Sequence, residues 1–266
     1  MKIGVFDSGL GGLFTLRAIA ETLPEYDYVY LGDMKRLPYG SRSHEEIYQF
    51  LVEALDFLFL KECVLVVVAC NTASAEALKR VQSEYLPSRH PDKKVLGMIV
   101  PMTEACAQYR RVGLIATTAT VHSGAYIREF KKRAPLSRLT SLATPSLVPF
   151  IESGDYEGVD ASLKDYLAQF TDIDALLLGC THYAIVKKSI RALMPTSIAI
   201  VAQDTVVPEK TRGYLDRHPE IEQQLSRGGT RAFFATFIGE RFQQFAKEWF
   251  GDAVRIQKVS LGQDVK

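Results

Sequence analysis

Two cysteines stand at the same point of two similar segments, and this repetition constrains the possible folds of the chain more than any other feature. Residues 64–80, VLVVVACNTASAEALKR, begin with a β-branched run too short to span a membrane and continue with a helical pattern. Residues 174–183, DALLLGCTHY, again place a cysteine after an apolar run and before a helical stretch. Each segment is therefore predicted to be a buried parallel strand that turns into a helix, at Cys70 and at Cys180.

The residues after the first cysteine place it at a helix start. Asn71 and Thr72 are favoured N-cap residues, so Cys70 is expected where a sheet edge meets the positive end of a helix, and a thiol there loses its proton more easily. A single cysteine is more often a buried structural residue. The second copy at Cys180 favours chemistry. Without CxxC spacing, the pair suggests two facing bases rather than a zinc site or a thioredoxin-type redox pair, and no metal site is predicted.

The remaining sequence alternates strand and helix patterns, as in a doubly wound α/β protein. KIGVFD at 2–7 and RVGLIAT at 111–117 share a pattern, which suggests two pseudo-symmetric domains with mainly parallel sheets and an active site in the cleft between them. The predicted domains are residues 1–93 with 206–266, and residues 94–205. The second is expected to open with a strand at 94–100 and to close with one at 197–204.

Two prolines are used to place helix starts in the second half. Pro101 is expected to open a helix over residues 102–110, since proline is favoured at the first helical position. Pro208 is allowed at the same position of a later helix, because the residue before a proline disfavours helical geometry.

A glycine-rich turn follows the first strand and raises a nucleotide-binding alternative. Gly9 and Gly11 of SGLGG would need a third glycine where Phe14 stands, so the dinucleotide fingerprint fails on its own spacing. Asp33, which ends the second predicted strand, could still act as a ribose-binding acid. The nucleotide-binding alternative therefore stays open but is weakly supported.

Asp7 ends the first predicted strand and is expected at the same sheet edge as Cys70. Its simpler role would be to cap the following helix. Residues 34–42, MKRLPYGSR, read as a loop over that edge that brings Tyr39 and Gly40 toward the site.

Composition limits the partners and the compartment. A formal net charge of +1 gives no electrostatic reason to expect nucleic acid or a membrane surface as a partner. No apolar run approaches the length of a transmembrane helix. Four cysteines in 266 residues, with a strand predicted from residue 2 and hence no signal peptide, indicate a reducing cytoplasm.

Two thiols on opposite sides of a cleft suit inversion of configuration at carbon. One base removes a proton from one face and the other donates a proton to the opposite face, which requires one thiolate and one thiol. The carbanion formed between these steps needs preorganised donors. Asn71, Thr72, Thr181 and the N–H groups of the two helix starts are expected to supply them.

Five motifs together carry a family resemblance: DSGLGG, GD with RLPYG, CNTASA, TTATVHSGAY and GCTHY. They resemble the glutamate racemases of the cofactor-independent aspartate/glutamate racemase group, in that family's order and over nearly the whole chain. The resemblance implies interconversion of L- and D-glutamate for bacterial peptidoglycan, without pyridoxal phosphate or metal. It also implies that Cys70 and Cys180 are the two bases and that Asp7 and His182 assist them. We further expect a homodimer.

The resemblance also implies a set of substrate-contacting residues, most of them hydroxyl, amide or acidic: Asp7, Ser8, Tyr39, Gly40, Asn71, Thr72, Thr117, Thr120, Glu152, Thr181 and His182. Two positions depart from the family pattern. Ala184 stands where a proline is usual, and Thr144 stands where a cysteine is common. Both are expected to lie outside the substrate contacts, so they put local backbone geometry in doubt more than chemistry.

Two alternatives remain. An aspartate racemase would use the same chemistry, and one methylene of side chain is worth only about 1–3 kcal/mol of discrimination. A non-catalytic small-ligand or nucleotide-binding protein could share the α/β fold, since fold does not imply function. The missing glycine counts against nucleotide binding, and the duplicated cysteine elbow counts against a non-catalytic protein.

Overall fold

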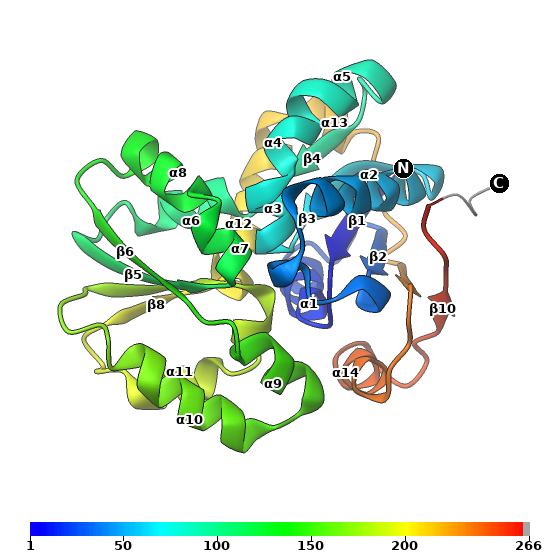
Figure 1. Ribbon diagram of the computed structural model, residues 1–266. Helices are drawn as coiled ribbons and strands as arrows, with labels where there is room; N and C mark the ends of the chain where they lie inside the picture. Colours follow the sequence, from blue (N-terminus) through cyan, green and yellow to red (C-terminus); the bar gives the residue numbers. More distant parts are fainter. Residues whose placement is uncertain (263–266) are drawn as a thin grey trace.

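Two parallel β-sheets form the framework of the protein (Figure 1). The computed structural model describes residues 1–262. The first sheet has the strand order β10-β9-β2-β1-β3-β4, and the second has the order β6-β5-β7-β8, with every recorded strand pair parallel. The strands are β1 (Lys2–Asp7), β2 (Tyr28–Gly32), β3 (Cys63–Val68), β4 (Lys94–Leu96), β5 (Arg111–Ala116), β6 (Arg138–Ala143), β7 (Ala175–Gly179), β8 (Ala199–Val201), β9 (Arg231–Ala235) and β10 (Ile256–Lys258).

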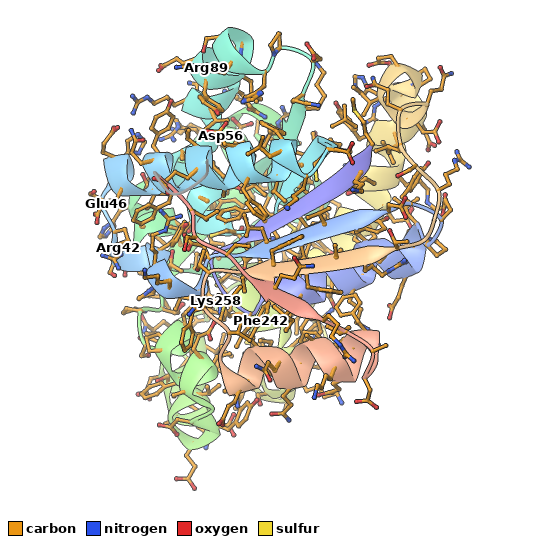
Figure 2. The ribbon with its side chains drawn as sticks, turned by 90° about the vertical axis from the view of Figure 1, so that its right-hand side faces the viewer. Arg42, Glu46, Asp56, Arg89, Phe242 and Lys258 are labelled. Atoms are coloured by element: carbon orange, nitrogen blue, oxygen red, sulfur yellow. The ribbon has the colours of Figure 1, made fainter. Side chains whose placement is uncertain are left out.

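Helices cover both faces of the sheets, which makes the fold a doubly wound α/β structure, as predicted. Figure 2 shows α2 over one face of the first sheet and α14 over the other. The helices are α1 (Gly12–Thr22), α2 (His44–Leu60), α3 (Asn71–Glu76), α4 (Leu78–Arg80), α5 (Leu86–Arg89), α6 (Ile99–Cys106), α7 (Thr118–His122), α8 (Ala125–Arg133), α9 (Leu147–Ser153), α10 (Tyr156–Leu167), α11 (Lys187–Leu193), α12 (Gln203–Arg217), α13 (Pro219–Glu222) and α14 (Glu240–Phe250).

Four consecutive strands of the first sheet have the same spatial order as the four strands of the second. In β2-β1-β3-β4 and in β6-β5-β7-β8 the chain starts on an inner strand, steps outward to one side, and then returns to the other side. This shared order bears out the predicted pseudo-symmetry. It creates one reversal of strand order between β1 and β3 and another between β5 and β7, and ligand sites in open α/β sheets lie at such points.

One hydrophobic core joins the two sheets. Val5 and Val67 of the first sheet and Leu114 of the second belong to the same buried cluster, together with Met102 of α6 and Val207 of α12. Helix α12 lies between the two sheets (Figure 1). The two halves are therefore packed directly against each other, which fixes the relation between their carboxyl edges.

The strand expected to open the second domain belongs instead to the first sheet. β4 covers only Lys94–Leu96 and pairs with β3, so the prediction that residues 94–100 start the second sheet is wrong. A short apolar strand carries no signal of which sheet it joins. The chain crosses to the second sheet after Leu96. We therefore propose the two domains with the first boundary at Leu96 in place of residue 93.

The two prolines lie inside their helices rather than at the first position. Helix α6 begins at Ile99, and Pro101 occupies its first turn, where a backbone N–H has no helical partner in any case. The strand expected at 197–204 ends at Val201, and α12 begins at Gln203 with Pro208 inside it. Tertiary packing outweighs the one hydrogen bond that Pro208 lacks, since Val207 and Pro208 are both buried.

Candidate active site

A small cavity of about 110 Å³ lies between the carboxyl edges of the two sheets. Most of the predicted site residues line it: Ser8, Tyr39, Gly40, Cys70, Asn71, Thr72, Thr117, Cys180, Thr181 and His182. Three predicted residues, Asp7, Thr120 and Glu152, are not on its wall and contact residues that are. Both thiols thus line one cavity.

The sequence did not indicate the apolar part of the wall. Leu37, Pro38, Pro145, Val148 and Pro149 line the cavity beside the polar residues. Thr144 also lines it, so the prediction that this position lies outside the site is wrong. The signal was available, because Thr144 follows β6 and the carboxyl ends of parallel strands share one edge.

Cys70 is itself the N-cap of α3, in place of the predicted Asn71 or Thr72. Its Sγ accepts a hydrogen bond from the Ala73 N–H at 3.4 Å and lies 3.3 Å from the Ser8 hydroxyl. Burial and the charge of Asp7 nevertheless raise the pKa of Cys70 to about 12, although these two hydrogen bonds oppose the rise. Burial therefore outweighs the effect of the helix start, which was expected to ease ionisation, and Cys70 stays a thiol.

The second elbow differs from the first. Residues Thr181–Ala184 form a single 3₁₀ turn, and α11 begins only at Lys187, so the prediction of a helix directly after Cys180 is wrong. The turn buries four consecutive side chains, and the Tyr183 hydroxyl lies 2.5 Å from the Thr144 hydroxyl. Cys180 Sγ instead lies 3.7 Å from His182 Nδ1.

His182 and Glu152 form a buried pair beside Cys180. His182 Nε2 lies 2.5 Å from Glu152 Oε1, and the same oxygen accepts from the Leu10 N–H at 3.2 Å. Burial lowers the pKa of His182, but its contacts with Cys180 and Glu152 outweigh this and hold the pKa well above its usual value. Burial likewise opposes ionisation of Glu152, and its bond to His182 keeps the pKa of Glu152 below the usual value. A positively charged imidazolium therefore adjoins the second thiol.

Asp7 joins the two halves from behind the cavity wall. Its carboxylate accepts hydrogen bonds from the Gly12 N–H at 2.9 Å, from the Gly9 N–H at 3.2 Å and from the Thr181 hydroxyl at 3.3 Å. A Cβ atom at Gly12 would lie 2.2 Å from Asp7 Cβ, which explains a glycine at this position. Burial raises the pKa of Asp7 to about 6, although the charge of His182 and the two glycine N–H groups oppose the rise.

Hydroxyl and amide groups also gather at the cavity wall. The Thr72 and Thr117 hydroxyls lie 2.9 Å apart, and Thr120 completes a triangle with both. Asn71 Oδ1 accepts from the Tyr126 hydroxyl at 2.8 Å, while Asn71 Nδ2 is buried and has no partner among the described residues. Because buried donors are normally satisfied, this amide is suited to bind an anionic ligand in the cavity.

The loop over the cavity is held by Asp33. The Tyr39 hydroxyl donates to Asp33 Oδ2 at 2.6 Å and the Arg36 guanidinium donates to the same oxygen at 2.5 Å. Asp33 is fully buried in these contacts. It is therefore not available as the ribose-binding acid of a nucleotide site, which further weakens that alternative.

Residues 1–262 lack two kinds of feature. No group of three or more histidine, cysteine or acidic side chains is placed to hold a metal ion. None of the helices described in this range combines the length and the apolar character that crossing a membrane requires.

Comparison with known proteins identifies a single family. The model of the Asp/Glu/hydantoin racemase family matches residues 10–206. A glutamate racemase from Paracoccus denitrificans is 36% identical over 276 residues, covering 97% of this chain and 100% of that protein. One from Gloeobacter violaceus is 38% identical and covers 98% of this chain and 97% of that protein.

Solved structures agree with the sequence comparison. A glutamate racemase from Bacillus anthracis superposes with a TM-score of 0.86 at 30% identity, covering 97% of each chain. A glutamate racemase from Francisella tularensis, solved in complex with D-glutamate, superposes with a TM-score of 0.85 at 31% identity, again covering 97% of each chain. An aspartate racemase from Picrophilus torridus is 18% identical with a TM-score of 0.55 and covers 80% of this chain and 95% of its own, so it shares the fold alone.

Proposed function

Because the chain belongs to the Asp/Glu/hydantoin racemase family, we propose that it racemises glutamate by a two-base mechanism in which Cys70 and Cys180 transfer the protons. The glutamate racemase activity follows from relatives that are 36% and 38% identical over almost the full chain. The aspartate racemase alternative has support from the fold only. The product D-glutamate serves peptidoglycan synthesis, as the family implies.

One observation carries the mechanism: two thiols line the same cavity from the carboxyl edges of two sheets with equivalent strand order. One sulfur, as thiolate, takes the α-proton from one face of the substrate and leaves a carbanion. The other, as thiol, gives its proton to the opposite face and becomes the thiolate. The substrate is inverted, no proton is gained or lost overall, and the two thiols exchange roles.

The surroundings of the two thiols support one starting state. Burial holds Cys70 as a thiol by raising its pKa to about 12, and the imidazolium of His182 gives negative charge on Cys180 a positive partner at 3.7 Å. Inversion of L-glutamate would start from this arrangement, with the proton taken up on the Cys180 side and donated by the Cys70 thiol. This agrees with the family resemblance, in which Cys180 takes the proton from L-glutamate and Cys70 takes it from D-glutamate.

The polar walls are assigned to substrate binding. The unpartnered Asn71 amide and the hydroxyls of Thr72 and Thr117 are proposed to hold the oxygens of the substrate carboxylate. These donors then stabilise the negative charge that develops when the carbanion forms. Ser8, Tyr39, Gly40 and Thr181 complete the wall. Asp7 and His182 assist the thiols on their own sides, while Thr120 and Glu152 hold wall residues in place.

Single cysteine variants test the mechanism. Cys70→Ala and Cys180→Ala should each abolish racemisation of glutamate, measured by circular dichroism or chiral chromatography. Cys106→Ala removes a buried thiol in α6 that is not on the cavity wall, and it should keep activity. Near-normal racemisation by either of the first two variants would refute the two-base mechanism. L- and D-aspartate measured in parallel should be turned over much more slowly than glutamate.

We also propose a cytoplasmic homodimer. All four cysteines are free, and the mechanism requires two of them to stay reduced, which a reducing compartment ensures. The dimer is proposed from the family resemblance. Light scattering coupled to size-exclusion chromatography would test it, and a mass equal to one chain would refute it.

A further inference from the structure

Both places where the chain crosses between the two sheets are hydrogen-bonded to the Cys70 elbow. At the first crossing, after β4, the Met98 N–H donates to Ser74 Oγ at 3.2 Å, and Ser74 Oγ donates to the Val68 carbonyl at 3.0 Å. At the second crossing, after β8, Gln203 Nε2 donates to the Ala69 carbonyl at 2.9 Å. The two residues before Cys70 are thus each tied to a crossing.

Gln203 is well placed to fix the peptide that carries Cys70. It is the first residue of α12 and only 3% exposed. The neighbouring strand β4 ends at Leu96, opposite Val67, and does not extend as far as Ala69. The Ala69 N–H bonds to the Phe6 carbonyl at 2.8 Å, and Gln203 bonds to the Ala69 carbonyl, which belongs to the peptide unit that joins Ala69 to Cys70.

Burying the polar side chain of Gln203 costs free energy, which indicates that its amide makes a needed hydrogen bond. Its Oε1 is buried and has no partner among the described residues. An apolar residue of similar length would fill the same space without leaving a polar atom unsatisfied. The hydrogen bond from Nε2 is therefore the contribution that packing alone would not require.

The Cys180 elbow is held differently. Its neighbour Thr181 bonds to Asp7 of β1, and Tyr183 bonds to Thr144 after β6. The bond from Thr181 to Asp7 thus restrains the residue after Cys180. The bond from Gln203 to the Ala69 carbonyl restrains the residue before Cys70.

We propose that Gln203 is a positioning residue for Cys70, which sets the reach of this thiol toward the substrate according to how the two halves are packed. The proposal rests on the two-base mechanism above. A small displacement of the Ala69 peptide moves Cys70 relative to the α-carbon, and proton transfer is sensitive to displacements of this size.

Substrate deuterium isotope effects can isolate the step at Cys70. With α-deuterated D-glutamate, the effect reports proton removal by Cys70; with α-deuterated L-glutamate, it reports removal by Cys180. Gln203→Met keeps the length of the side chain and removes the donor. Thr205→Ala is the matched control, because it removes a hydrogen bond to the Ala202 carbonyl in the same turn of α12.

In Gln203→Met, kcat/KM should fall about ten- to a hundredfold, equally for both enantiomers because their equilibrium constant is unity. The isotope effect on kcat/KM should rise with D-glutamate and fall with L-glutamate, since the Cys70 step becomes more rate-limiting. Thr205→Ala should leave both isotope effects at their wild-type values. Should the methionine variant not fold, Gln203→Asn, which keeps the amide but shortens its reach, provides the same measurement.

Unchanged kinetics in Gln203→Met, or isotope effects that move together for both enantiomers, would overturn the positioning role. Failure of the proposed function would look different. In that case the wild-type protein itself would not racemise glutamate, or it would still do so after substitution of Cys70.

Discussion

The Thr181 hydroxyl lies 3.3 Å from both carboxylate oxygens of Asp7, so the turn that carries Cys180 is hydrogen-bonded to the last residue of β1. Asp7 also accepts the N–H groups of Gly9 and Gly12 at the start of α1. One fully buried carboxylate therefore accepts N–H groups at the start of α1, as the expected capping role requires, and also holds the turn that carries Cys180. Its ionisation links the packing of the two halves to pH.

The first prediction concerns stability and pH. The pKa of Asp7 is about 6 in the folded protein, against 3.8 for an unperturbed aspartate, so the folded state binds the proton more tightly. The resulting stabilisation is fully present below about pH 4 and is lost as pH rises through 6. It amounts to up to about 3 kcal/mol. Asp7→Asn lacks this dependence.

The free energy of unfolding of Asp7→Asn, relative to wild type, should therefore be more favourable at pH 7 than at pH 4. Urea unfolding of both proteins at several pH values would measure the difference. A constant difference across this range would show that the Asp7 carboxyl does not titrate abnormally.

The sequence predicted the parts of the site that depend on local patterns. Apolar β-branched runs followed by a helical period place Cys70 and Cys180 at strand ends, and parallel strands bring such ends to one edge. The capping box of Ser43 and Glu46 at the start of α2 is a local feature of the same kind, since it depends on residues three apart.

The parts that failed depend on contacts between distant residues. The helical pattern after Cys180 gives way to a 3₁₀ turn in which Tyr183 is fully buried and bonds to Thr144. The pKa of Cys70 depends on complete burial, which outweighs the helix terminus that the sequence does show. Neither the partner of Tyr183 nor the burial of Cys70 can be read from neighbours in the sequence.

The second prediction concerns the buried ion pair beside Cys180. In Glu152→Gln, loss of the negative charge should lower the pKa of His182, because that charge favours the imidazolium. The basic limb of the pH profile of kcat should then move to lower pH, with a fall in kcat of about ten- to a hundredfold near pH 8. Glu157→Gln removes an acid from the first turn of α10 and is the control. An unchanged profile in Glu152→Gln would mean that the protonation of His182 does not limit turnover.

The third prediction concerns the orientation of the Asn71 amide. Tyr126→Phe removes the hydroxyl that donates to Asn71 Oδ1, so the orientation of the Asn71 amide, with its unpartnered Nδ2, is no longer fixed. The loss should be about 1 kcal/mol, seen mainly as a several-fold rise in KM for both enantiomers. Tyr109→Phe, which precedes β5 at the opposite edge of the sheet, should keep the wild-type KM. A fall in kcat without change in KM would contradict the assignment of Asn71 to substrate binding.

The fourth prediction compares the two directions of the reaction. Asp7 is proposed to assist on the Cys70 side, since its charge acts on that thiol, and His182 lies beside Cys180. His182→Asn should therefore change kcat with L-glutamate by a different factor from kcat with D-glutamate, and Asp7→Asn should show the opposite preference. Because the equilibrium constant between enantiomers is unity, kcat/KM must stay equal in the two directions. Any asymmetry in kcat has to be matched by the same asymmetry in KM.

Progress curves started from each pure enantiomer and followed by circular dichroism yield all four constants for each variant. A histidine that serves only to hold the 3₁₀ turn would lower kcat by the same factor in both directions. Such an outcome would reduce His182 to a structural residue, even if the loss of activity were large. Opposite asymmetries in the two variants would instead place each group with its own thiol, because a general disturbance of the cavity cannot favour L-glutamate in one variant and D-glutamate in the other.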